Sequence, residues 1–90
     1  MEKQEKLWSM LIGYILDDQN FIDRLIYMRE SGSNLIENER GNFIIAPTIG
    51  ENGWESRKQY DQEKLCLMPY KNKLIVALKR LKEDLKSENN

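Results

Sequence analysis

A nearly continuous apolar segment, residues 7–16, constrains the fold of this chain more than any other feature. Its sequence is Leu-Trp-Ser-Met-Leu-Ile-Gly-Tyr-Ile-Leu, in which only Ser9 and Gly13 are not apolar. A surface helix has one apolar stripe and one polar face, whereas this segment would be apolar on nearly every side. Such a helix must be covered from more than one direction. We therefore expect it either at the centre of the fold or in a subunit interface.

The excess of apolar surface on this helix leads us to predict the second alternative, a subunit interface. Ser9 and Gly13 lie four residues apart on one side of the helix, where they would let another backbone approach closely. We therefore predict a homodimer that forms through this helix. The predicted interface residues are Trp8, Ser9, Leu11, Ile12, Gly13 and Ile15.

Length and charge indicate one soluble domain, residues 1–90. The chain is 40% apolar and 32% charged, which is typical of globular proteins, and its net charge is −1. This balance argues against a dedicated nucleic-acid coat protein.

The charge is unevenly distributed along the chain, because residues 1–63 carry a net −5 and residues 64–90 a net +4. Opposite-signed halves can attract each other within a fold, between subunits, or toward a charged partner.

The cellular location is predicted to be the cytoplasm. The single cysteine, Cys66, cannot form an internal disulfide, and the apolar segment is shorter than the roughly 20 residues that a membrane helix needs. The residues around the apolar segment also do not fit a signal peptide, because Asp17-Asp18-Gln19-Asn20 follows where small residues would be needed.

The first third of the chain predicts two helices, residues 2–17 and 20–31. Asp17 and Asp18 disfavour continuation of the first helix, and Asp18 or Asn20 can cap the second. Gly32 is placed for a left-handed C-cap. Helices joined by so short a connection should pack as an antiparallel pair.

The remainder predicts a small sheet, residues 35–68, and a last helix, residues 70–86. Residues 35–37 and 42–46 are rich in β-branched and aromatic residues and predict two strands around a turn at Gly41. Residues 48–63 form a long polar loop, and residues 64–68 are expected to be a third strand closed by Pro69. The last helix has its apolar stripe at Leu74, Leu78, Leu81 and Leu85.

These elements predict an α+β fold in the order α-α-β-β-β-α. A helical hairpin would pack against a small antiparallel sheet, and the C-terminal helix would close the core. An arrangement like a small winged helix is the alternative, because helices and a hairpin can also be assembled in that way.

The residues that usually carry enzyme chemistry are missing or have a simpler explanation. Histidine is absent, which removes the usual general base and the commonest metal ligand. Cys66 stands between two leucines and is expected to be a structural, buried thiol. Asp17, Asp18 and Asp23 crowd one helical junction but are explained by helix ends and caps. We therefore predict no enzymatic activity, no metal site and no cofactor.

The polar loop holds the residues predicted to bind a partner: Trp54, Arg57, Lys58 and Tyr60. Trp, Tyr and Arg are the residues that most often anchor protein interfaces. The same mixture could stack on single-stranded bases while its cations contact phosphates. Alternatively, Trp54 folds back and covers the small core.

The last helix provides the basis for a competing function. Lys71, Lys79, Lys82 and Lys86 follow one flank of its leucine stripe, so they are the candidate nucleic-acid contacts. A solvated helix face explains the same lysines equally simply.

The function predicted from the sequence is that of a small cytoplasmic protein-binding regulator or inhibitor that acts as a homodimer on another protein. Its Lys-, Asn- and Ile-rich composition is compatible with an accessory protein of a phage or another mobile element. The alternative is a regulator that binds DNA or RNA through the basic last helix and the loop between Trp54 and Tyr60.

Overall fold

The structure of the chain is a computed structural model, which describes residues 2–46 and 65–88. Two helices, α1 (Glu2–Gly13) and α2 (Gln19–Glu30), are followed by strands β1 (Asn34–Glu37) and β2 (Phe43–Ala46). Residues 65–67 are helical and lead into the 3-10 helix η1 (Met68–Tyr70) and the last helix, α4 (Lys71–Glu88). Helices and a small antiparallel sheet share one core, which confirms the α+β class. No helix among the described residues is both long and apolar enough to span a bilayer.

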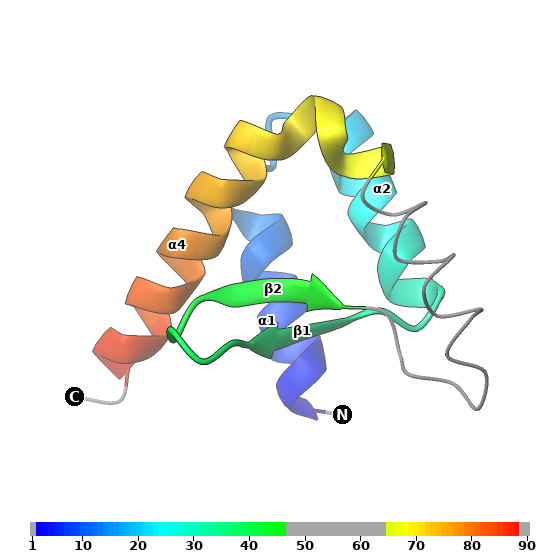
Figure 1. The fold of residues 1–90 in the computed structure, drawn as a ribbon. Coiled ribbons are helices and arrows are strands. Elements are labelled where there is room, and N and C mark those ends of the chain that lie inside the picture. Colours follow the sequence, from blue (N-terminus) through cyan, green and yellow to red (C-terminus); the bar gives the residue numbers. More distant parts are fainter. Residues whose placement is uncertain (1, 47–64, 89–90) are drawn as a thin grey trace.

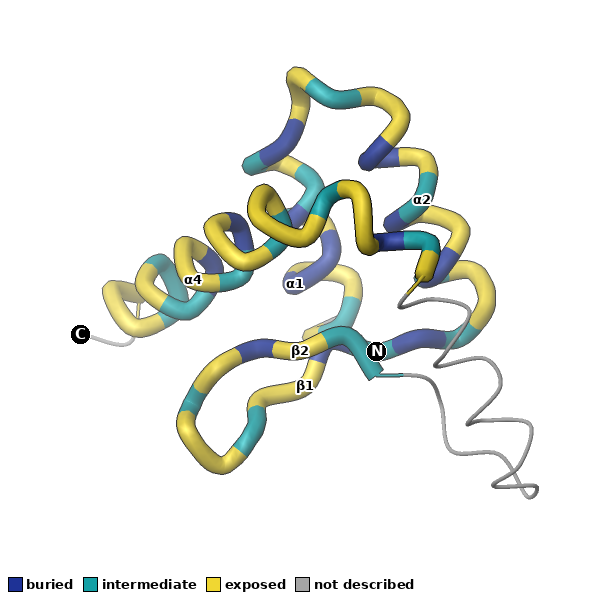
Figure 2. Tube along the Cα trace, turned by 45° about the horizontal axis from the view of Figure 1, so that its top comes forward, coloured by how far each residue is buried: buried dark blue, intermediate teal, exposed yellow. Residues whose placement is uncertain are grey.

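The apolar helix α1 lies at the centre of the fold. It contacts α2, α4 and β1, and Figure 1 shows α2 and α4 on its two sides with the β-hairpin crossing its face. Its side chains Leu7, Trp8 and Leu11 are at most 1% exposed. The other helices and the hairpin turn their own apolar side chains toward it, and their outer sides are largely exposed (Figure 2). The buried residues of these elements are Phe21, Ile22, Leu25, Met28, Leu35, Phe43, Leu67, Ala77 and Leu81.

The connection between α1 and α2 is a tight turn. The α-helix ends at Gly13, earlier than the predicted residue 17, because the next backbone bonds run over three residues: Tyr14 N–H donates to the Leu11 carbonyl and Ile15 N–H to the Ile12 carbonyl, each at 3.1 Å. The Asp18 side chain accepts a hydrogen bond from the Phe21 N–H, which confirms Asp18 as the N-cap of α2.

The hairpin has the turn that the sequence predicts. Gly41 has φ +78°, a conformation that other residues rarely adopt, and the Asn38 side chain accepts hydrogen bonds from the backbone N–H groups of Arg40 and Asn42. In the antiparallel register Ile36 lies opposite Ile44, and both side chains are exposed on the outer face. Leu35 and Phe43 are buried, which places their face of the hairpin on α1 and α4.

The predicted third strand, residues 64–68, is wrong for the part that the structure describes. Residues 65–67 are helical, and Pro69 lies in the first turn of η1, where its missing N–H costs no hydrogen bond. A short apolar run such as Leu65-Cys66-Leu67-Met68 fits a strand and a helix equally well. Tertiary contacts favour the helix, because the Tyr70 ring stacks on Phe21 with ring centroids 4.8 Å apart and Arg24 donates a hydrogen bond to the Cys66 carbonyl. The described residues therefore form a two-stranded sheet.

A side chain of α1 fixes the position of the hairpin. The Gln4 amide donates to the Leu35 carbonyl and accepts from the Leu35 N–H, both at 2.9 Å. One side chain thus satisfies both backbone groups of a residue in β1, at the place where a neighbouring strand would otherwise bind. The hairpin is thereby held against α1 by polar contacts as well as by apolar burial.

Replacing Gln4 by alanine is expected to lower the free energy of unfolding by about 1–3 kcal/mol, because two partly buried backbone groups of Leu35 lose their partner. Urea denaturation followed by circular dichroism measures this change. The matched control is Gln19→Ala, because among the described residues the Gln19 amide bonds only the exposed Asp23 side chain. This variant should change the stability by less than about 0.5 kcal/mol. Equal losses for the two variants would show that Gln4 does not hold the hairpin.

Candidate functional site: a groove between the α1–α2 connection and α4

The residues predicted to bind a protein or a nucleic acid do not come together in the described part of the structure. The predicted partner-binding residues Trp54, Arg57, Lys58 and Tyr60, and the loop 48–63 that contains them, lie outside the described residues. Among the predicted nucleic-acid contacts, Lys71, Lys79 and Lys86 are exposed on α4. Lys82 is half-buried, and its ammonium group donates a hydrogen bond to the side-chain oxygen of Asn42 at 3.1 Å. The predicted basic face is therefore divided between solvent and the hairpin.

The predicted dimer interface on α1 requires a correction. Trp8, Leu11 and Ile15 are at most 4% exposed within a single chain, so they have no surface to offer a second subunit. Ile12 is half-buried, and Ser9 and Gly13 are exposed. A side chain added at Gly13 would meet no atom of the described residues within 4 Å, so no described backbone segment of the same chain uses this glycine for close approach. The apolar surface of residues 7–15 is covered mainly by α2, α4 and the hairpin, which the sequence pattern could not distinguish from cover by a partner.

One apolar residue of the segment does remain outside the core. Leu16 is 74% exposed, in the turn between α1 and α2. Its two neighbours line a groove of about 370 Å³ between this turn and the N-terminal half of α4. The turn supplies Tyr14, Ile15 and Asp17, and α4 supplies Asn72, Lys73, Val76, Ala77 and Arg80.

The groove has an apolar floor and an apolar wall. Ile15 and Ala77 are buried and belong to the core, whereas Val76 is 66% exposed on the α4 side. Val76 lies opposite the leucine stripe of the last helix, so the core does not use it. The exposed aliphatic groups of this surface are thus Val76, which lines the groove, and Leu16, which stands between two lining residues.

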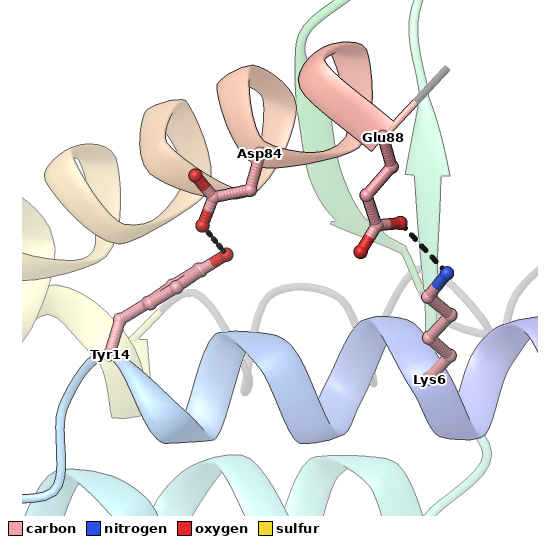
Figure 3. A network of polar contacts seen from close by, with 4 residues as sticks. All are labelled: Lys6, Tyr14, Asp84 and Glu88. Atoms are coloured by element: carbon pink, nitrogen blue, oxygen red, sulfur yellow. Dashed lines mark hydrogen bonds and ion pairs between the residues drawn. The ribbon is translucent and has the colours of Figure 1, made fainter. Parts of the chain in front are cut away.

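Tyr14 joins the groove to the C-terminal half of α4. Its hydroxyl donates a hydrogen bond to the Asp84 carboxylate at 2.6 Å, and the Arg80 guanidinium lies over its ring, 4.7 Å from the ring centroid (Figure 3 shows the Tyr14–Asp84 bond). Burial, reinforced by the hydrogen bond to Asp84, raises the pKa of Tyr14 from 10.0 to about 12. Nearer the chain ends, Lys6 and Glu88 form an ion pair at 2.8 Å between the same two helices (Figure 3). The contact with the Tyr14 ring holds Arg80 beside the groove.

The charges around the groove are sorted by sign. Asp17 and Asp18 lie on the side of the turn, and Lys73 and Arg80 lie on α4. Lys73 and Asp18 form an ion pair at 3.0 Å, and their hydrogen bond lowers the pKa of Asp18 and raises the pKa of Lys73. Asp17 and Arg80 form no ion pair with another described residue.

The described residues gather no cluster of side chains that would hold a metal ion. No group of three or more Cys, Asp or Glu side chains comes together within residues 2–46 and 65–88. Cys66 is half-buried, and Arg24 reaches its sulfur at 3.7 Å. The groove offers apolar contact and charges of both signs, which are the properties of a binding surface.

Comparison of the chain with protein-family models, with curated proteins and with solved structures found no match. The groove itself is therefore the basis on which a function can be inferred.

Replacing Tyr14 by phenylalanine is expected to lower the free energy of unfolding at neutral pH by about 1 kcal/mol, because Asp84 loses its hydrogen bond from the Tyr14 hydroxyl. The wild-type protein is also expected to lose stability at alkaline pH as Tyr14 ionises, and Tyr14→Phe should lack this loss. The folded state holds the Tyr14 proton more tightly than the unfolded chain does. Its stabilisation is therefore complete below pH 10 and lost as the pH rises through about 12.

Urea denaturation of both proteins between about pH 7 and about pH 12 tests this expectation. Tyr27→Phe is the control, because Tyr27 is 66% exposed on α2 and its side chain makes no hydrogen bond with another described residue. If Tyr14→Phe retains the alkaline loss of the wild-type protein, the bond between Tyr14 and Asp84 does not contribute to folding.

Proposed function

We propose that this protein acts by binding another polypeptide, as a small regulator or inhibitor without a catalytic step. The observation that supports the proposal is the groove beside Leu16. Its wall on α4 carries the exposed Val76, its floor is part of the core, and charges of both signs lie around it. An apolar centre with a polar rim is the usual form of a protein-binding surface.

The balance of charge favours a polypeptide over a nucleic acid as the ligand. Phosphates require an excess of cations. At the groove, Lys73 is already paired with Asp18, and Asp17 lies on the wall opposite Arg80. The exposed Leu16 and Val76 would gain nothing from a phosphate backbone, whereas an aliphatic side chain of a partner would cover them.

Selection from a displayed library of random peptides on the immobilised protein tests the proposal for a partner of any sequence. Enriched peptides are expected to carry an aliphatic residue next to an acidic or a basic one, and to bind Val76→Lys at least about ten times more weakly than the wild-type protein. The matched control is Tyr27→Lys. Val76 and Tyr27 are both 66% exposed, and Tyr27 lies on α2, which contributes no residue to the groove.

Two results would contradict the proposal. The first is a library that yields no binder, or binders that Val76→Lys and Tyr27→Lys affect equally. The second is tight binding of a labelled DNA duplex or single strand that weakens steeply with salt and that Lys79→Glu abolishes, because this is the behaviour expected of a phosphate-binding helix.

A further inference from the structure

We propose that the polypeptide bound in the groove is a second copy of this chain. The two copies would form a twofold dimer in which Leu16 of each protomer enters the groove of the other. This inference rests on one part of the function proposed above, the binding of a polypeptide in the groove, and identifies that polypeptide. The dimer forms through the turn and α4, rather than through the buried face of α1.

The projecting residue and the groove belong to one surface. Leu16 is 74% exposed and stands between Ile15 and Asp17, both of which line the groove. The Asp18 N–H donates a hydrogen bond to the Ile15 carbonyl at 3.1 Å, which closes the turn around Leu16. A twofold axis beside this turn would bring each leucine to the other groove at once, since the same patch serves both protomers.

The charges on this surface are self-complementary across a twofold axis. Carboxylates lie on the turn and cations on α4, so a twofold rotation places the carboxylate side of one protomer opposite the cation side of the other. Lys73 pairs with Asp18 within the chain and also attracts Asp17, whereas Arg80 forms no ion pair with a described carboxylate, so we assign the contact between the protomers to Asp17 and Arg80. The stacking of Arg80 on Tyr14 holds its guanidinium beside the groove in advance.

The same distribution makes other occupants less suitable. A strongly acidic segment would be repelled by Asp17, and a strongly basic segment by Arg80, because both charges border one groove. A copy of the same surface presents both signs in the matching order. One groove and one leucine from each protomer make up the contact, so we expect a weak dimer with a dissociation constant between about 10 µM and about 1 mM.

Sedimentation equilibrium of the full chain, from about 10 µM to about 1 mM, tests the position of the interface. The wild-type protein is expected to shift from monomer to dimer over this range. Leu16→Lys should weaken the dimer at least about tenfold, because a charge would enter the apolar groove of the partner. Tyr27→Lys is the control and should leave the dissociation constant unchanged, and circular dichroism verifies that each variant is folded.

A pair of charge reversals tests the arrangement between protomers. In the proposed dimer, residue 17 of one protomer faces residue 80 of the other. Asp17→Arg therefore brings two cations together at this contact, and Arg80→Glu brings two carboxylates together. Each variant alone is therefore expected to be at least about tenfold weaker as a dimer. A mixture of the two should restore the association, because each variant then supplies the charge that the other lacks. Contacts within one chain cannot produce this restoration.

Three outcomes would overturn the inference: a wild-type protein that stays monomeric at about 1 mM, a dimer that Leu16→Lys leaves intact, and a mixture that associates no better than its components. The proposed function fails separately. If the chain is monomeric while selected peptides still lose affinity for Val76→Lys, the groove binds a different polypeptide. If neither the copy nor the peptides bind, both proposals are wrong.

Discussion

The enclosure of one apolar helix is the constraint on which the rest of this structure depends. Leu7, Trp8 and Leu11 of α1 are almost completely removed from water. Consecutive side chains such as Leu7 and Trp8 point about 100° apart around a helix, so cover is needed from more than one direction. In 90 residues this cover has to come from several elements at once: α2 on one side, α4 on another, and β1 of the hairpin on a third. The positions of these elements follow from the need to reach α1.

Polar contacts then select one arrangement of the elements around that helix. Near the start of α1, the amide of Gln4 bonds both backbone groups of Leu35 and fixes the hairpin. In the turn that follows α1, Tyr14 donates a hydrogen bond to Asp84, and Asp18 forms an ion pair with Lys73. These two contacts attach α4 to the turn. Apolar burial is not directional, whereas these bonds are. The groove results from this arrangement, because α4 is held beside the turn without covering Leu16.

The local features of the fold could be predicted from the sequence, and the contacts between distant residues could not. The cap at Asp18 and the turn at Gly41 were predictable because each depends on residues close in the chain. Tyr14 and Asp84 are 70 residues apart, and Gln4 and Leu35 are 31 apart, so no pattern of spacing indicates either pair.

The same limit explains why two predictions, the interface on α1 and the third strand, had to be corrected. The sequence shows that residues 7–16 need cover but not what covers them, and residues 65–68 become helical through contacts with α2. For the groove, the only local signal was that Val76 lies opposite the leucine stripe and Leu16 beside two acids.

A single chain encloses α1 without help from a partner, and every other feature of the fold follows from this enclosure. Amide hydrogen exchange at a protein concentration of a few micromolar, where the proposed dimer is dissociated, tests it directly. The amides of Leu11 and Ile12, whose partners lie within α1, should exchange only when the whole domain opens. Their free energy of exchange should then equal the free energy of unfolding measured in urea. Exchange of these amides at a free energy well below the global value, or protection that appears only at high protein concentration, would contradict enclosure by a single chain.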